Sequence, residues 1–315
     1  MYGATVGRLG ILGIEATTNQ AVCHIVPDPT IAATRYIYHA LSSQVPNLIS
    51  MGVGGAQPNI NQGIIKRLEI LLPPLPEQRR IAAILDQADA LRAKRREALA
   101  QLDSLTQSIF IEMFGDPIGN SQSWPLCSLE SVCKKITDGT HKTPIYVASG
   151  IEFLSAKDLK NERIVWGTGK FILKAEHTQL IKRCNPELGD VLLAKSGSLG
   201  AVAVIDRSHE FSLFESLCLI KHDRSKINGQ FLVGLLRVPS MLSHLLGKNK
   251  GIAIKHLHLV DVRQLEILIP PLALQEEYAK LTQAVERLRR DAQAALLQLD
   301  TLFASLQHRA FQGEL

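Results

Sequence analysis

A long internal repeat constrains the fold of this chain more than any other feature. Residues 68–75 (LEILLPPL) reappear as residues 265–272 (LEILIPPL), and the two copies stay aligned without a gap, 197 residues apart, as far as Phe114 and Phe311. Nineteen of these 47 positions are identical, which chance does not produce over a gapless stretch. The chain therefore contains two related units that end in the same way.

A weaker similarity extends upstream of the repeat. Residues 2–7 resemble residues 196–200, residues 21–23 resemble 216–218, and Gly54 corresponds to Gly251. Each unit is thus predicted to end with the same series of elements. A glycine loop is followed by a strand, a helix and a second glycine loop, and then by an apolar strand, a Pro-Pro pair and a long helix. The second unit also contains about 75 residues, 120–194, with no counterpart in the first. We therefore expect a partial first domain and a complete second one.

The segments after the two Pro-Pro pairs predict long helices. Residues 76–114 contain only one proline, at their start, and no glycine, and they are rich in Ala, Leu, Arg, Gln and Glu. Apolar residues recur at heptad positions a and d in both copies, which favours an antiparallel coiled coil between helices of roughly 55–60 Å. The predicted seam includes Ile84, Leu91, Leu102, Leu105, Leu281, Leu288, Leu299 and Leu302.

The remaining segments predict an α+β fold with strand-rich domains. Short apolar runs bounded by glycine or polar residues indicate strands at 150–154, 189–194, 200–205, 216–220 and 265–269, and 230–246 is predicted to be a helix. The predicted organisation is a partial first domain (1–73), a first long helix (74–115), a second domain (116–270) and a second long helix (271–315).

Polar and basic loops supply the candidate binding residues. Residues 194–200 combine glycines, hydroxyls and a lysine, which suits phosphate contacts, although an ordinary hairpin turn explains them equally well. Residues 247–258 form a basic loop of the kind that follows a DNA backbone, with a merely solvated loop as the less favoured alternative. A third polar turn spans 138–143. The candidates are Arg8, Lys142, Lys195, Ser196, Ser198, Lys248, Asn249, Lys250, Lys255, His256 and His258.

No pattern of residues indicates a chemical site. The chain lacks a phosphate-binding GxxxxGK[ST] loop, a dinucleotide-binding GxGxxG motif, an Asn-Pro-Pro-aromatic run and a clustered acidic site for Mg²⁺. Five separated cysteines without a CxxC pair favour reduced thiols in a cytoplasmic protein. We expect no metal ion and no membrane span. The net charge of +5 permits a polyanionic partner without requiring one.

One family resemblance rests on the repeated segment. Residues 69–81 (EILLPPLPEQRRI), the following long helix and its end at 114–117 (FGDP) resemble the specificity (S) subunit of type I restriction–modification enzymes, as does the glycine loop at 2–7. The resemblance implies a non-catalytic subunit that reads a split target in double-stranded DNA. It further implies two modification subunits that use S-adenosylmethionine, and restriction subunits that use ATP and Mg²⁺.

Two departures from the family pattern leave alternatives open. The second copy has Ala273 and Leu274 where the first has Pro76 and Glu77, and the first domain lacks its front part. We therefore expect a specificity subunit truncated in its first target-recognition domain. The alternatives are a coiled-coil scaffold without DNA binding, a nonfunctional fragment, and a self-contained methyltransferase or nuclease, which the missing motifs disfavour.

Overall fold

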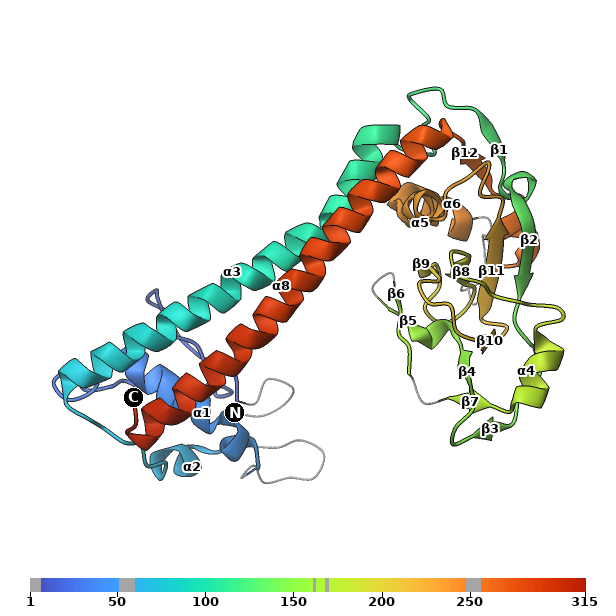
Figure 1. Ribbon diagram of the computed structural model, residues 1–315. Coiled ribbons are helices and arrows are strands. Elements are labelled where there is room, and N and C mark those ends of the chain that lie inside the picture. The colour runs from blue at the N-terminus through green and yellow to red at the C-terminus, as the bar shows by residue number, and fades with distance from the viewer. Residues whose placement is uncertain (1–6, 51–59, 161–162, 168–169, 248–255) are drawn as a thin grey trace. The chain divides into compact units, whose positions relative to one another are not determined.

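The computed structural model describes residues 7–50, 60–160, 163–167, 170–247 and 256–315. The chain divides into two compact units, one formed within residues 1–100 and 289–315 and the other by 101–288. Both long helices, α3 (Leu75–Phe114) and α8 (Leu272–Gln312), contribute one part to each unit (Figure 1). No helix in the described part of the chain is long and apolar enough to cross a membrane.

The second unit is built on two four-stranded sheets. The first has the strand order β2-β11-β8-β9 and is antiparallel throughout; the second has the order β10-β4-β7-β3, in which only the β10–β4 pair is parallel. The bounds are β2 Cys133–Asp138, β3 Tyr146–Val147, β4 Ile151–Leu154, β7 Phe171–Ile172, β8 Val191–Ala194, β9 Val202–Val204, β10 Phe211–Leu213 and β11 Leu217–His222. These sheets confirm the predicted α+β class for this unit.

Smaller elements complete the second unit. Two short strand pairs join β1 to β12 and β5 to β6. The helical elements include two 3₁₀ turns, η1 and η2. The bounds are β1 Leu126–Ser128, η1 Leu129–Val132, η2 Ala156–Asp158, β5 Leu159–Lys160, β6 Arg163–Ile164, α4 Lys174–Leu180, α5 Gly229–Arg237, α6 Pro239–Gly247, α7 Leu259–Arg263 and β12 Glu266–Leu268.

The helix predicted at 230–246 is two helices rather than one. Helix α5 ends at Arg237 and α6 begins at Pro239. Val238 between them is extended, with φ −58° and ψ 127°, because a residue that precedes proline is sterically disfavoured in the helical region. Phe231 of α5 and Leu245 of α6 still lie in one apolar core.

The only regular elements in the described part of the first unit are helices. It contains α1 (Thr34–Ser50), α2 (Gln62–Lys66) and parts of α3 and α8. Its core consists of Tyr36 and Ala40 of α1, packed with residues of α3 and α8 that include Leu85 and Ala310. Tyr36 also contacts Phe311, with ring centroids 5.5 Å apart.

The strands predicted for the first unit are absent from its described residues. Residues 69–71 correspond to β12, residues 22–27 to β11, and residues 9–11 to β9, yet none of them is assigned to a strand. In the second unit these strands pair with β1, β2 and β8, which all lie within residues 120–194, the stretch to which no part of residues 1–74 corresponds. A strand needs a neighbour to satisfy its backbone hydrogen bonds, so apolar sequence alone does not produce one here.

The long helices pack antiparallel in each unit, as predicted. In the first unit the start of α3 packs against the end of α8, through Ile81, Leu85 and Ala310. In the second unit the end of α3 packs against the start of α8, where the rings of Phe110 and Tyr278 lie 5.5 Å apart. Figure 1 shows the two helices side by side with opposite directions within each unit.

The predicted a/d seam needs correction at the d positions. Ile84, Leu102 and Leu299 are half-buried. The other predicted seam residues are exposed by 38–57%, namely Leu91, Leu105, Leu281, Leu288 and Leu302. The contact instead uses positions a and e, such as Ile81 and Leu85, which are buried where the leucines at the d positions are exposed.

Polar contacts reinforce the shifted seam. Arg92, an e-position residue, donates from Nε to Asp300 Oδ1 at 2.6 Å, and its guanidinium lies 4.2 Å from the ring centroid of Phe303. Arg96 also donates to Asp300, at 3.0 Å. Two arginines of the basic run in α3 therefore pair with α8 within the first unit.

Candidate nucleic-acid interface

The second unit brings together three polar segments that the sequence singled out. They are the turn after β2 (138–142), the loop after β8 (195–200) and the residues that precede α7 (256–258). Leu257 N donates to Lys195 O at 2.8 Å, and Lys195 N donates to Ser216 O at 2.8 Å. Gly139 N donates to Leu217 O at 3.3 Å. Backbone hydrogen bonds thus hold all three segments around the start of β11.

A fourth segment, η2, joins this face through Ser216. Ala156 N donates to the Ser216 hydroxyl at 3.0 Å, and a Cβ built on Gly197 would lie 3.8 Å from Ala156 Cβ. Ser155 caps η2 reciprocally with Asp158. Lys157, between these two residues, is exposed. Sequence reasoning missed Lys157, although the Ser-x-x-Asp capping pattern marks its turn.

Two glycines explain the course of the loop after β8. Gly197 and Gly200 have φ angles of +72° and +82°, in the left-handed region that favours glycine. A Cβ on Gly200 would also lie 2.3 Å from Leu242 Cδ1. Gly200 therefore lets the loop return against α6, while Ser198 at its tip stays exposed and Ser196 is half-buried.

Asp138 is the electrostatic centre of this face. Its carboxylate is buried and accepts from Lys195 Nζ at 2.5 Å, from the Arg183 guanidinium and, at 3.1 Å, from His141 in the tautomer that places a hydrogen on Nε2. Burial alone would raise the pKa of Asp138. The hydrogen bond from Lys195 and the charges of Lys195, Arg183 and His141 outweigh that effect, so the pKa lies below its ordinary value.

Lys195 was predicted to contact phosphate, but the structure buries its side chain. The residue is only 7% exposed, and its ammonium faces Asp138. A buried ion pair of this kind orients the loops that it joins, whereas phosphate contacts need an accessible cation. Around the pair, the Arg183 and His141 side chains are 55% and 62% exposed, so positive charge still reaches the surface.

The other candidate residues fall into three groups. Lys142, His256 and His258 are exposed on the same set of loops. Arg8 is exposed but belongs to the first unit. The predicted basic loop lies largely outside the described residues, and with it Lys248, Asn249, Lys250 and Lys255.

The described residues offer no obvious catalytic centre. Among them, no three His, Cys, Asp or Glu side chains converge as a metal ion would require. His177 Nδ1 lies 2.8 Å from Ser212 Oγ, but both residues are buried. Burial also lowers the pKa of His177 more than its neighbour Glu210 raises it, so this pair joins α4 to β10.

Comparison with known proteins places the chain in a family. Residues 1–101 and 122–298 match the model of the type I restriction modification DNA specificity domain. These two blocks cover most of the chain and follow its internal duplication. The chain belongs to this family.

Named relatives agree with the family match. The chain is 21% identical to the type I restriction enzyme EcoBI specificity subunit of Escherichia coli, over 95% of this chain and 69% of that protein. It is 23% identical to the MjaIX specificity subunit of Methanocaldococcus jannaschii, over 99% and 76%. A shorter match, 41% identical over 21% of this chain and 15% of the relative, is to the StySPI specificity subunit of Salmonella potsdam.

Solved structures share the fold. A structure that describes complex assembly and conformational transition of the type I R-M system has a TM-score of 0.59, at 20% identity, over 90% of this chain and 72% of that chain. The S subunit from M. genitalium has a TM-score of 0.52 at 18% identity, over 90% and 74%.

Proposed function

We propose that this chain is the non-catalytic specificity subunit of a type I restriction–modification complex and recognises double-stranded DNA. The observation that carries the proposal is the family match over both repeated blocks, 1–101 and 122–298. Methyl transfer from S-adenosylmethionine belongs to modification subunits in this proposal. ATP-driven translocation and Mg²⁺-dependent cleavage belong to restriction subunits.

The face around Asp138 is the proposed DNA contact of the second unit. Lys142, Lys157, His256 and His258 are exposed there, and the Asp138 carboxylate is already neutralised by its own partners. Exposed cations on mobile side chains suit phosphate, while residues held on short loops suit base edges in a groove. Lys248, Asn249, Lys250 and Lys255 remain candidates for the same role outside the described residues.

The exposed d-position leucines are the proposed docking surface for two modification subunits. Leu91 and Leu288 are equivalent in the repeat and are 53% and 57% exposed; Leu105 and Leu302 are equivalent and are 38% and 50% exposed. Apolar residues kept exposed at equivalent positions suit two copies of one partner, each bound to one copy of the repeat.

The direct test combines purified chain, modification subunits from the same cell and a random DNA library. We expect selection of a defined DNA sequence and methylation that requires both components. The chain alone should neither methylate DNA in S-adenosylmethionine nor cleave it in Mg²⁺. Activity from the chain alone would overturn the non-catalytic assignment. Failure of the assembled complex to shift any DNA in a gel would favour the scaffold alternative.

A further inference from the structure

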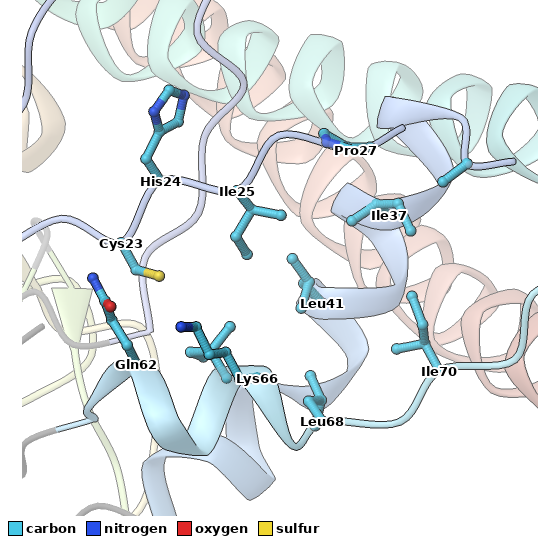
Figure 2. Close-up of a pocket in the computed structure, with 12 residues that line it drawn as sticks. Cys23, His24, Ile25, Pro27, Ile37, Leu41, Gln62, Lys66, Leu68 and Ile70 are labelled. Atoms are coloured by element: carbon cyan, nitrogen blue, oxygen red, sulfur yellow. The ribbon is translucent and has the colours of Figure 1, made fainter. Parts of the chain in front are cut away.

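Buried charge distinguishes the two units. The first unit has an apolar cavity of about 370 Å³, and Figure 2 shows Ile25 and Leu41 pointing toward one another across it. Among the described residues of this unit, no Asp, Glu, Lys or Arg is buried. The described part of the second unit buries several such side chains, namely Asp138, Glu152, Asp158, Asp190 and Lys195. Taking a charge out of water costs free energy, so each of these groups needs a partner or a role.

Two of the buried carboxylates form similar ion pairs at opposite ends of β8. Asp190 directly precedes this strand, and its Oδ2 accepts from Lys221 Nζ at 2.7 Å. Lys195 directly follows it, and its Nζ donates to Asp138 Oδ2 at 2.5 Å. Asp190 and Asp138 are 4% and 2% exposed. At about 3.3 Å per residue, Asp190 and Lys195 lie roughly 16 Å apart along the strand. The two pairs are therefore matched in chemistry and burial but separated in space.

The Asp138–Lys195 pair connects two strands that do not pair with each other. In the sheet, β11 lies between β2 and β8. Asp138 ends β2 opposite Cys218 of β11, and Ala194, just before Lys195, lies opposite Leu217. Because neighbouring strands are about 4.8 Å apart, β2 and β8 are separated by roughly 10 Å, too far for backbone hydrogen bonds. The ion pair is thus a side-chain link between the turn after β2 and the loop after β8.

The backbone of Lys195 extends this link to the third segment of the face. Its carbonyl oxygen accepts from Leu257 N at 2.8 Å, and Leu257 lies between the exposed His256 and His258. A displacement of Lys195 would therefore move residues 256–258 together with the loop 195–200. Through Lys195, the Asp138 carboxylate controls the position of side chains that it does not itself contact.

Asp138 also restrains a cation at the surface. The Arg183 guanidinium donates to Asp138 Oδ1, although its side chain is 55% exposed. A free guanidinium binds the phosphates of any DNA sequence, whereas one that is paired with a carboxylate has fewer donors to offer. Burial of Lys195 withholds a second cation from the same kind of contact. The carboxylate therefore limits the part of DNA binding that carries no sequence information.

We propose that Asp138 is a positioning residue that determines DNA specificity on this face. It holds the three loops in place through Lys195, and it limits sequence-independent phosphate binding through Arg183. This inference rests on the proposed recognition of DNA and adds the residue on which discrimination depends. A purely structural role would instead weaken binding to every DNA alike.

The test measures affinity of the complex with modification subunits for the sequence that the unaltered complex selects and for random DNA. Asp138→Asn keeps the shape of the side chain and removes its charge. We expect the preference for the selected sequence to fall at least about tenfold, because base contacts need fixed loop geometry. Affinity for random DNA should stay the same or rise, and the slope of log affinity against log salt should steepen by up to about 0.9, since Arg183 becomes free for one phosphate. An unchanged preference overturns the proposal.

Asp190→Asn is the matched control. It removes the charge of the other buried carboxylate, whose partners Lys221 and Glu187 N lie at the opposite end of β8 from the candidate interface. We expect the preference and the salt slope to match those of the unaltered complex, with unchanged circular dichroism in both variants. An equal loss of preference in Asp190→Asn and Asp138→Asn would indicate general destabilisation and overturn the proposal.

A double variant assigns the gain in phosphate binding. Asp138→Asn combined with Arg183→Gln should retain the lost preference but return the salt slope to that of the unaltered complex. A slope that stays steep in the double variant overturns the role given to Arg183.

Hydrogen exchange of the chain without DNA tests the positioning separately. The amides of Lys195 and Leu257 should exchange at least about tenfold faster in Asp138→Asn than in the unaltered chain or in Asp190→Asn, because the loops that hold them open more often. Unchanged protection of both amides overturns the proposal. Faster exchange together with an unaltered complex that prefers no DNA sequence would support the link between the loops and contradict the proposed function instead.

Discussion

Gln78 and Gln275 make the same three hydrogen bonds in different units of the chain. Gln78 Oε1 accepts from Ala33 N at 2.8 Å, and its Nε2 donates to Ile31 O and Pro73 O at 2.8 and 2.7 Å. Gln275 Oε1 accepts from Asn228 N at 2.9 Å, and its Nε2 donates to Lys226 O and Pro270 O at 3.5 and 2.8 Å. Both residues are fully buried.

This shared glutamine explains why the apolar segment, the Pro-Pro pair and the long helix recur together in the repeat. Each amide joins the start of a long helix to the residue just before a second helix, α1 or α5, and to the first proline of the Pro-Pro pair. The glutamine therefore fixes the same arrangement of the apolar segment, the prolines and the long helix in both units. The aromatic contacts follow the same relation, because Phe311 meets Tyr36 in one unit and Phe114 meets Phe231 in the other.

Replacement of Gln275 by leucine should destabilise the second unit. The change leaves a buried backbone N–H and buried carbonyl oxygens without their partner, and each such group costs about 1–3 kcal/mol. We expect a decrease of roughly 2–4 kcal/mol in the free energy of unfolding, measured by urea titration with circular dichroism. Gln101→Leu, at an exposed position of α3, is the matched control. An unchanged urea midpoint for Gln275→Leu would contradict this role.

The a/e seam predicts opposite outcomes for neighbouring leucines. Leu85 is fully buried between the helices of the first unit, whereas Leu91 is 53% exposed. Leu85→Asp places an uncompensated charge in the core and should cost about 3–5 kcal/mol of stability. Leu91→Asp should change stability by less than about 1 kcal/mol. Thermal melts of the two variants provide the measurement. Equal losses of stability in the two variants would favour the a/d seam over the a/e seam.

Leu91 should matter for assembly rather than for folding. If modification subunits dock on the exposed leucines, Leu91→Asp and Leu288→Asp should each reduce binding of one of two such subunits while leaving the melting temperature nearly unchanged. Native mass spectrometry of the mixed subunits reports the stoichiometry directly. Full assembly of both variants would remove the leucines from the proposed docking surface.

The pH dependence of stability should report on Asp138. Its pKa lies below the ordinary value of 3.8 in the folded protein. Its contribution to stability is therefore complete above that ordinary value and is lost as the pH falls through the lowered folded value. Asp138→Asn should thus be less stable than the unaltered chain at about pH 7, and the difference should shrink at about pH 3. Urea unfolding at both pH values tests this, and a difference independent of pH would contradict it.

The features that were predictable from the sequence are those that a local pattern or the internal repeat determines. The long helices and the strands of the second unit followed from composition and from runs of apolar residues. The a/e seam did not, because the apolar stripes of α3 and α8 fit both registers, and the contacts of Arg92 with Asp300 and Phe303 belong to only one. Residues 69–71 look like a strand, but strand formation depends on a distant partner.

The candidate interface was predictable only in part. Glycine, hydroxyl and basic residues marked the three loops, and the structure brings those loops together. The pairing of Lys195 with Asp138 joins residues 57 apart in sequence, and no local signal distinguishes a buried lysine from an exposed one. Arg183 carries no motif of its own, and the Ser-x-x-Asp pattern around Lys157 predicts only a turn, so both residues join the site only through the fold.

Phosphate contacts and base contacts on this face should separate by their salt dependence. Lys142 and Lys157 are exposed cations, and each phosphate contact adds about 0.9 to the slope of log affinity against log salt on duplex DNA. Lys142→Ala and Lys157→Ala should therefore weaken binding to all sequences similarly and flatten the slope. Lys134→Ala, at the opposite end of β2 from Asp138, is the matched control and should change neither.

His256 and His258 should behave differently from the lysines. Both are exposed beside Leu257, which the backbone of Lys195 holds in place, and a side chain that bonds to a base edge contributes about 1–3 kcal/mol of discrimination. His256→Ala and His258→Ala should thus lower affinity for the selected sequence more than for random DNA, with little change in the salt slope. Anisotropy titrations of the complex with modification subunits, at several salt concentrations, give the affinity and the salt slope on the selected sequence and on random DNA. Equal loss on both DNAs with a flatter slope would make these histidines phosphate contacts instead.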